Sequence, residues 1–285
     1  MREIRTVGVV GLGTMGAGIA QVCVEAGFET IGREVESSVG EEARAQIDHF
    51  LTRKVEKGQL DAEAKDAALG RLSLTTELDS LAGCDLVIEA AFEDLAVKHE
   101  VFGALEDAVA GDAILATDTS ALSVTQIAAA TEHPERVVGM HFFNPAPLMK
   151  LVEIVRAERT DDDVFETAYA FAAELGKSPI RCSDTPGFVV NRILIPLLND
   201  CIRVLDEAGV SPEDLDTAMR HGAGWPMGPA TLVDLVGIDI HVHASEALYE
   251  KLREQRMAPP PRIVRMANAG KLGRKSGQGF YDYGD

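Results

Sequence analysis

A histidine and a carboxylate stand twelve residues apart in a chain that also opens with a glycine-rich loop. His141 lies in His141-Phe142-Phe143-Asn144-Pro145, and Glu153 follows inside an apolar run. A histidine titrates near neutral pH and can take a proton from an alcohol, while a nearby carboxylate can hold its tautomer and stabilise the imidazolium. The two residues are therefore a candidate general base for alcohol oxidation and its carboxylate partner.

The glycine loop provides the second chemical signal. It has the spacing GxGxxG and lies between a predicted strand, residues 6–10, and a predicted helix, residues 15–25. Its first glycine permits a tight turn, the second lets backbone amides approach a pyrophosphate, and the third lets the helix pack on the sheet. The loop predicts a dinucleotide cradle formed by Gly11, Leu12, Gly13, Thr14, Met15 and Gly16.

Glu34 follows at the spacing expected of the acid that binds the adenosine ribose, after a second predicted strand at residues 29–33. Its charge would repel a 2′-phosphate, so NAD is the predicted cofactor. Arg33 is a cation immediately before it, and the sequence therefore leaves NADP open.

The elements that position these residues alternate between strand and helix. Apolar runs predict further strands at residues 72–74, 85–90, 113–117, 136–140 and 151–155. Helical periodicity is found at residues 39–55, 61–69, 97–110 and 123–130. Such alternation is typical of a parallel, doubly wound sheet, so the predicted fold is α/β with a Rossmann-type N-terminal domain.

The pattern changes to helical periodicity beyond residue 184. Residues 186–208 predict one long apolar helix, although Pro196 inside it removes a backbone hydrogen bond. Ser211 before Pro212 predicts another helix start, with the serine as N-cap. We expect an NAD-binding domain over residues 1–184 and a smaller all-α substrate and dimerisation domain over residues 185–285.

Charge and composition restrict the partners. The formal net charge is −19, whereas nucleic acids and anionic membranes both require a basic face. No apolar run reaches the roughly 18 to 20 residues of a membrane helix, and the N-terminus leads into a strand rather than a signal peptide. We expect no nucleic acid partner, no membrane partner and a cytoplasmic location.

The cysteines and the His241–His243 pair predict no metal. No acidic or cysteine ligand set accompanies the histidines in sequence, so both are expected at the surface. The cysteines are widely spaced, without a CxxC pair, and are expected to be free and mostly buried thiols. They are Cys23, Cys84, Cys182 and Cys201.

Several motifs in fixed order resemble those of the 3-hydroxyacyl-CoA dehydrogenases, and most closely the bacterial 3-hydroxybutyryl-CoA type. Besides the glycine loop they are Thr119-Ser120, His141–Pro145, Asp184–Arg192 and Gly222–Pro229. The resemblance implies an NAD-dependent enzyme that interconverts short-chain (S)-3-hydroxyacyl-CoA and 3-oxoacyl-CoA, with its active site between the domains.

The resemblance also implies roles for individual residues. His141 matches the catalytic histidine and Glu153 its carboxylate, while Ser120 and Asn191 match contacts to the substrate's 3-oxygen. The implied cofactor contacts are Glu93, Lys98, Asn144 and Lys275, and the implied coenzyme A contact is Lys57. On so acidic a chain the phosphates of coenzyme A need a local basic patch, and the candidates are Lys54 with Lys57, or the tail with Lys271, Arg274 and Lys275.

Two departures from the family pattern stand out. Asp118 replaces a common asparagine beside Ser120, which introduces a possible charge near the active centre. The second strand, Ile31-Gly32-Arg33-Glu34, replaces the usual apolar run that ends in an aspartate. The first departure affects the charge of the site, and the second makes the choice of cofactor less certain.

Two alternatives remain open at this stage. A related dehydrogenase could act on a hydroxylated sugar acid with the same base and no coenzyme A. A nucleotide-binding relative could have lost catalysis. The apolar segments 188–204 and 227–236 exceed what a domain of about 100 residues needs for its own core, which predicts a homodimer built on that half.

Overall fold

The computed structural model describes residues 2–284, which divide into two compact units. The first unit ends at Phe188 and the second begins at Val189. Within residues 2–284 no helix has both the length and the apolar character needed to cross a bilayer.

The first unit is built on one sheet with the strand order β3-β2-β1-β4-β5-β6-β7-β8. The strands are β1 (Thr6–Val10), β2 (Glu29–Arg33), β3 (Leu72–Thr75), β4 (Leu86–Glu89), β5 (Ile114–Thr117), β6 (Val137–Phe142), β7 (Leu151–Arg156) and β8 (Ser178–Ser183). The first six run parallel in the order 3-2-1-4-5-6, which is the doubly wound Rossmann order. The predicted fold class is confirmed.

The expectation of an all-parallel sheet is wrong at β7, which runs antiparallel to β6. Only residues 143–150 connect the two strands, and a parallel return needs a crossover of about a dozen residues or more. β8 then pairs parallel with β7. The sequence analysis missed β8 because this partly exposed strand contains Pro179 and lacks the apolar run that marks the others.

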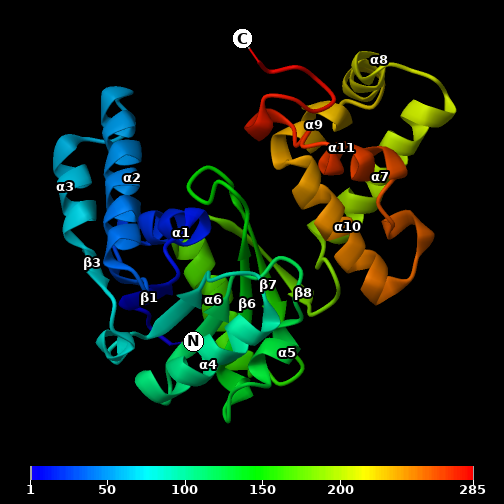
Figure 1. Ribbon diagram of the computed structural model, residues 1–285. Coiled ribbons are helices and arrows are strands. Elements are labelled where there is room, and N and C mark those ends of the chain that lie inside the picture. The colour runs from blue at the N-terminus through cyan, green and yellow to red at the C-terminus, as the bar shows by residue number, and fades with distance from the viewer. Residues whose placement is uncertain (1, 285) are drawn as a thin grey trace. The chain divides into compact units, whose positions relative to one another are not determined.

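The helices of the first unit begin and end within two residues of their predicted bounds, and α6 is an additional one. They are α1 (Thr14–Glu25), α2 (Ser37–Glu56), α3 (Ala62–Gly70), α4 (Leu95–Ala108), α5 (Val124–Ala128) and α6 (Asp162–Glu174), with 3₁₀ turns η1 (Leu78–Leu81) and η2 (Pro134–Arg136). Figure 1 shows α2 and α3 side by side, next to β3. Asp61 and Asp94 cap α3 and α4 through their carboxylates.

Apolar side chains are buried on both faces of the sheet. In β4, Leu86 and Ile88 pack into one cluster together with Ile19 of α1, while Val87 packs into another with Phe102 of α4. Successive side chains of a strand point to opposite faces, so each central strand is held from both sides. The carboxyl ends of the central strands therefore form a fixed platform.

The second unit is helical, as expected. It contains α7 (Val190–Glu207), α8 (Pro212–Thr217), the π-helical turn η3 (Ala218–Gly222), α9 (Pro229–Val236), α10 (Ile238–Leu252), η4 (Gln255–Met257), α11 (Pro261–Asn268) and η5 (Arg274–Ser276). Ser211 Oγ accepts from the Asp214 N–H at 3.1 Å, which confirms the predicted N-cap. The helix predicted from residue 186 begins only at Val190, because Phe188 has a φ of 47° that an α-helix cannot contain.

Candidate active site

The glycine loop joins the carboxyl end of β1 to the start of α1. Gly11 has a φ of 86°, a left-handed conformation that favours glycine. A Cβ on Gly16 would lie 1.7 Å from the Gly11 carbonyl oxygen, so only glycine lets the helix approach the turn this closely. A Cβ on Gly13 would meet no atom within 4 Å. The loop is open at that position, beside the first N–H groups of α1, and this geometry fits a pyrophosphate.

Glu34 lies beside this loop, at the end of β2. Its Oε2 accepts from the Leu12 N–H at 2.8 Å, and its Oε1 accepts from the Val35 N–H at 2.7 Å. Arg33 donates from Nε to the Thr76 carbonyl at 3.1 Å, toward the end of β3. A negative charge therefore lies against the loop at the position expected for the ribose partner.

The other loop residues differ in their surroundings. Leu12 is buried, Met15 is partly buried against the same core, and Thr14 begins α1 and lines a cavity with Asn144.

His141 and Glu153 lie directly opposite each other on β6 and β7. The distance from His141 Nδ1 to Glu153 Oε2 is 2.7 Å, and the two residues are only 5% and 0% exposed. The ring centroids of Phe143 and Phe188 lie 4.5 Å and 5.6 Å from that of the imidazole. Because the carboxylate engages Nδ1, Nε2 is the nitrogen left to exchange a proton. The pairing anticipated from the sequence is present.

The segment of Ser120 lies at the same edge of the sheet as His141. Thr117 ends β5 and is paired with Gly139 of the parallel strand β6. The next residue, Asp118, accepts from the Phe142 N–H at 2.8 Å through Oδ1. In open α/β sheets, ligands bind outside the carboxyl ends of the strands. The glycine loop, the Ser120 segment and His141 all lie at that edge.

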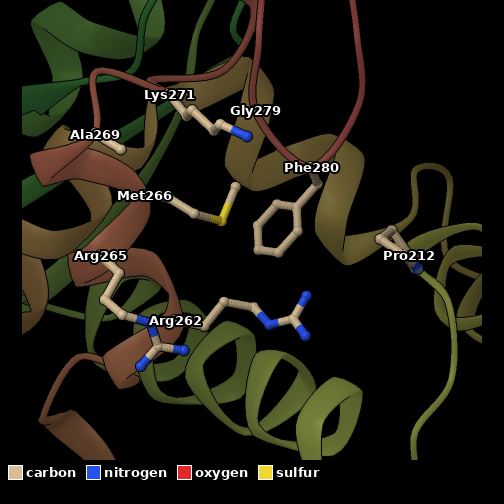
Figure 2. Close-up of a pocket in the computed structure, with 8 residues that line it drawn as sticks. All are labelled: Pro212, Arg262, Arg265, Met266, Ala269, Lys271, Gly279 and Phe280. Carbon is tan, nitrogen blue, oxygen red and sulfur yellow. The ribbon is translucent and has the colours of Figure 1, made fainter.

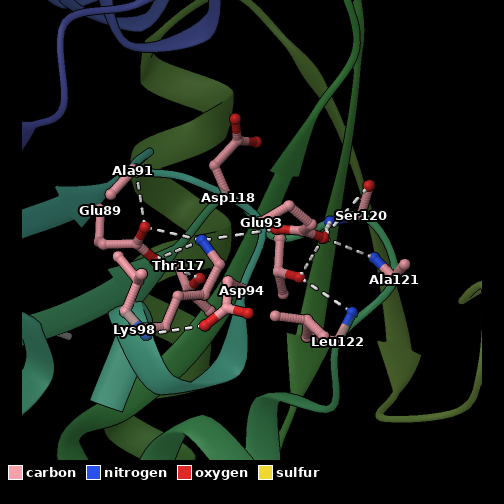
Figure 3. A network of polar contacts seen from close by, with 12 residues as sticks. Glu89, Ala91, Glu93, Asp94, Lys98, Thr117, Asp118, Ser120, Ala121 and Leu122 are labelled. Atoms are coloured by element: carbon pink, nitrogen blue, oxygen red, sulfur yellow. Dashed lines mark hydrogen bonds and ion pairs between the residues drawn. The ribbon is translucent and has the colours of Figure 1, made fainter. Parts of the chain in front are cut away.

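Glu93 organises the loop that carries Ser120 (Figure 3). Its Oε1 accepts from the Thr119 hydroxyl at 2.7 Å, and from the N–H groups of Ser120 and Ala121 at 2.9 Å and 3.0 Å. The Ser120 hydroxyl lies 3.3 Å from the same oxygen. Burial alone would raise the pKa of Glu93, but the Lys98 ammonium and the loop donors outweigh it and lower the pKa. An ionised carboxylate therefore holds the loop.

Lys98 lies behind Glu93 and is 1% exposed. Its Nζ donates to both oxygens of Glu89, at 2.7 Å and 2.9 Å, and lies 3.5 Å from Glu93 Oε2. The sequence analysis missed Glu89, a buried carboxylate at the end of β4. The available signal was an acid inside the apolar run of residues 86–90.

A basic cavity of about 410 Å³ lies next to the glycine loop, within the first unit. Asn144 and the neighbouring Pro145–Leu148 segment form one wall, and α1, α2 and the residues just after α2 provide the rest. Phe50 and Leu148 are 43% and 72% exposed. The cations that line the cavity are Arg53, Lys54 and Lys57, of which Lys54 is paired with Glu25.

A second basic cavity, of about 420 Å³, lies within the second unit (Figure 2). The Met266 side chain points toward the Phe280 ring, and Arg262, Arg265 and Lys271 are arranged around them. Arg262 is bound to Asp206, with Nε donating at 2.8 Å. Lys271 belongs to the tail patch considered from the sequence, so each candidate basic patch contributes to a cavity in its own unit.

The remaining predicted residues belong to the second unit. Asn191 lies in the first turn of α7, and Lys275 Nζ is 2.7 Å from Asp239 Oδ2.

The expectation of surface histidines is wrong for His241, which is buried and whose Nε2 lies 2.9 Å from Asn199 Oδ1. Burial lowers the pKa of His241 to about 4, so it is neutral at physiological pH, whereas His243 is exposed. Over residues 2–284, no group of three or more His, Cys, Asp or Glu side chains is placed to hold a metal ion.

Asp118 provides a test of how this site differs from the family pattern. Burial raises the pKa of the Asp118 carboxyl well above its ordinary value, against the hydrogen bond from Phe142 and the charge of Lys98. The stability associated with a raised pKa is fully present below the unfolded value and is lost as the pH rises through the folded one. We expect Asp118→Asn, which retains the acceptor oxygen without a charge, to raise Tm by about 2–4 °C at pH 8.

The difference in Tm should shrink towards pH 4, where both side chains are neutral. Thermal unfolding followed by circular dichroism at the two pH values checks this prediction. A lower Tm of the variant at pH 8 would show that the ionised carboxylate is the stabilising form.

The fold and this edge of the sheet define a dinucleotide-binding protein of the doubly wound class. The family model described as "3-hydroxyacyl-CoA dehydrogenase, NAD binding domain" matches residues 6–185, and the one described as "3-hydroxyacyl-CoA dehydrogenase, C-terminal domain" matches residues 187–283. The chain therefore belongs to the 3-hydroxyacyl-CoA dehydrogenase family, a family of enzymes, and it has that family's NAD-binding domain.

Relatives match over nearly the whole chain. It is 45% identical to a 3-hydroxybutyryl-CoA dehydrogenase of Bradyrhizobium diazoefficiens, over 98% of this chain and 96% of that one. It is 44% identical to a 3-hydroxybutyryl-CoA dehydrogenase of Mycobacterium tuberculosis, over 98% of this chain and 99% of that one. Among solved structures, the (S)-3-hydroxybutyryl-CoA dehydrogenase of Ralstonia eutropha matches with a TM-score of 0.96 and 39% identity, over 99% of this chain and 100% of that one. The family resemblance stated from the motifs is confirmed.

Proposed function

We propose that this protein interconverts short-chain (S)-3-hydroxyacyl-CoA and 3-oxoacyl-CoA with NAD, and that His141 exchanges the proton. The hydrogen bond of 2.7 Å between His141 Nδ1 and Glu153 Oε2, at the carboxyl edge of an NAD-binding sheet, is the observation that carries the proposal. The names of the relatives support the substrate class. The same edge provides the glycine loop for the cofactor.

The proposed chemistry assigns each residue one task. In the oxidative direction Nε2 of His141 takes the proton of the 3-hydroxyl group, and in the reductive direction the imidazolium returns it. The nicotinamide, when bound, accepts or supplies the hydride at C3. Glu153 holds the imidazole with Nε2 free and balances the positive charge that develops on it. Ser120 and Asn191 keep the role that the family pattern implies, as contacts to the 3-oxygen.

The choice of NAD over NADP is supported by the charge beside the glycine loop. Glu34 places a carboxylate against the Leu12 N–H, where a 2′-phosphate would be repelled. Arg33, the cation that left NADP open, donates to the Thr76 carbonyl instead. We therefore propose NAD as the cofactor.

The basic cavity beside Asn144 is the proposed binding site of the coenzyme A portion. Its cations suit phosphates, and the exposed side chains of Phe50 and Leu148 provide apolar surface for an adenine ring. The cavity shares Thr14 and Asn144 with the predicted cofactor contacts. This placement favours the Lys54 and Lys57 patch over the tail patch.

We expect Lys57→Glu to raise KM for a 3-oxoacyl-CoA about tenfold, which corresponds to about 1.4 kcal/mol. The reason is that a carboxylate replaces a cation in the proposed phosphate site. Turnover of an N-acetylcysteamine thioester, which has no phosphate, should be unaffected. Steady-state kinetics with both thioesters measure the difference.

The matched control is Lys271→Glu, which makes the same charge change in the cavity of the second unit. It should leave both KM values unchanged. If Lys271→Glu raises KM for the coenzyme A thioester and Lys57→Glu does not, the tail patch is the binding site.

The function itself is tested by NADH oxidation with 3-oxoacyl-CoA substrates of increasing chain length, starting from acetoacetyl-CoA. The assay is repeated with NADPH and, in the oxidative direction, with free hydroxy acids and NAD. Preference for the shortest thioesters and for NADH supports the proposal. Faster turnover of a free hydroxylated sugar acid would favour the other dehydrogenase class, and NADH binding without turnover of any thioester would indicate a catalytically inactive relative.

We also propose that the protein is a homodimer through its second unit. Apolar side chains of that unit are exposed on α7, α9 and α10, among them Ile193 at 61%, Leu235 at 48% and Ile240 at 52%. Burial of such surface is the usual source of dimer stability. Light or X-ray scattering at micromolar concentration gives the mass, and a monomeric mass refutes the dimer.

A further inference from the structure

Glu89 is a buried acid at the centre of the sheet that the proposed chemistry does not use. It ends β4, between β1 and β5, and is 0% exposed. Its Oε1 accepts from the Ala91 N–H at 2.7 Å, its Oε2 accepts from the Thr117 hydroxyl at 2.7 Å, and Lys98 donates to both oxygens. A buried ion pair is weak evidence for stability, because an apolar pair of the same volume often packs as well. The position of this pair suggests another use.

Lys98 connects Glu89 to a second carboxylate. The lysine lies in the first turn of α4, and its ammonium lies between the two oxygens of Glu89 and Oε2 of Glu93 at 3.5 Å. Lys98 and Glu89 are almost completely buried, whereas the Glu93 side chain is 33% exposed. The cation thus joins a carboxylate inside the sheet to one that reaches the edge.

Glu93 connects Lys98 to the loop that carries Ser120. With Oε2 facing Lys98, Oε1 receives the donors of the Thr119–Ala121 loop, including the N–H and hydroxyl of Ser120 (Figure 3). The backbone ties the same region together, since the Asp118 N–H donates to the Glu89 carbonyl at 2.8 Å. The position of the loop is therefore fixed relative to the end of β4 by these side chains as well as by a backbone hydrogen bond.

We propose that Glu89 is a positioning residue, which fixes Lys98 and Glu93 and thereby the Ser120 loop. The expected effect on turnover rests on the proposed function, whereas the expected effect on the position of the loop does not. In Glu89→Gln the ammonium loses the carboxylate of Glu89 and keeps its ion pair with Glu93. The ammonium and Glu93 draw together, and Oε1 of Glu93 is pulled away from the loop donors.

The expected result for Glu89→Gln has two parts. Hydrogen exchange at the Ser120 and Ala121 amides becomes faster, because both donate to Glu93. Turnover of the 3-oxoacyl-CoA falls about 10- to 100-fold, the range that a displacement of about 1 Å in a site can cause. The Kd for NADH, measured by fluorescence titration, should rise by less than the loss of turnover, because the glycine loop is unchanged although Glu93 and Lys98 are also implied cofactor contacts.

Glu106→Gln is the matched control, at the opposite end of the same helix α4. Glu106 accepts from the N–H groups of Glu132 and His133 and pairs with the buried Arg136 at 3.4 Å. This variant also removes the charge of a carboxylate paired with a buried cation, but it should change neither turnover nor the exchange of the Ser120 and Ala121 amides.

The double variant Glu89→Gln with Lys98→Met removes both buried charges. It therefore leaves no unpaired buried charge that could by itself prevent folding. A merely structural pair predicts that turnover and exchange return to wild-type values in this variant. The proposal predicts that both remain altered, because Glu93 has lost its anchor. Unchanged exchange at Ser120 and Ala121 in Glu89→Gln, or a loss of NADH affinity equal to the loss of turnover, overturns the proposal. If the wild-type protein turns over no thioester, the proposed function is refuted. The positioning role of Glu89 is still tested in that case, by hydrogen exchange at the Ser120 and Ala121 amides.

Discussion

Replacing His141 by alanine is expected to lower turnover of a 3-oxoacyl-CoA by about 10²- to 10⁴-fold, the contribution of a positioned general acid or base. The physical reason is that the buried Glu153 carboxylate holds His141 through Nδ1 and leaves Nε2 to exchange a proton with the substrate. The imidazole lies on β6, away from the glycine loop on β1. The Kd for NADH should therefore change by less than about twofold.

His133→Ala is the matched control for this prediction. His133 also pairs with a carboxylate, Glu135, at 3.0 Å, but the pair is exposed and lies at the start of β6 rather than its end. Its removal should leave turnover unchanged. Stopped-flow or steady-state kinetics measure turnover of both variants, and an NADH titration measures their Kd for the cofactor. If His141→Ala weakens NADH binding as much as turnover, the variant is misfolded or the role is wrong.

Glu153→Gln should reduce turnover by a factor that approaches the roughly 10⁴ measured when a carboxylate behind a catalytic histidine becomes an amide. The amide can donate to Nδ1 and so select the tautomer whose Nε2 already carries a proton. It also cannot balance the charge of the imidazolium. The loss should be seen with Tm unchanged or raised, because the substitution removes a charge from a site that is 0% exposed.

Glu135→Gln provides the comparison, since it makes the same change in the exposed pair. It should affect neither turnover nor Tm measurably. A loss below about tenfold in Glu153→Gln would mean that the carboxylate serves the packing of β7 and not the proton transfer.

The register of two strands explains why the pair forms at all. His141 and Glu153 face each other because β7 turns back antiparallel on β6 and places their Cα atoms in register. In an antiparallel ladder, directly opposed residues present their side chains on the same face. A shift by one residue would turn Glu153 to the other face of the sheet, and the hydrogen bond would be lost.

Local pattern was sufficient for much of this protein. The strand–glycine loop–helix unit, the alternation of strands and helices typical of a doubly wound sheet, and the helical second unit all follow from apolar periodicity and from glycine positions, which depend on a few neighbouring residues. The family assignment follows from motifs in fixed order and is confirmed by matches to both family models. The catalytic and binding roles given to individual residues remain predictions.

Tertiary structure alone decided the features that depend on contacts between different helices and strands. These are the reversal of β7, the pairing of Glu89 with Lys98, the raised pKa of Asp118 and the burial of His241. The reversal of β7 depends on strand pairing, and the other three depend on burial and on which polar groups meet, none of which is determined by a few neighbouring residues. Glu89 looks like an isolated acid in an apolar run until α4 brings Lys98 to it. The charge of a side chain is set by its surroundings, and only the folded chain determines what those are.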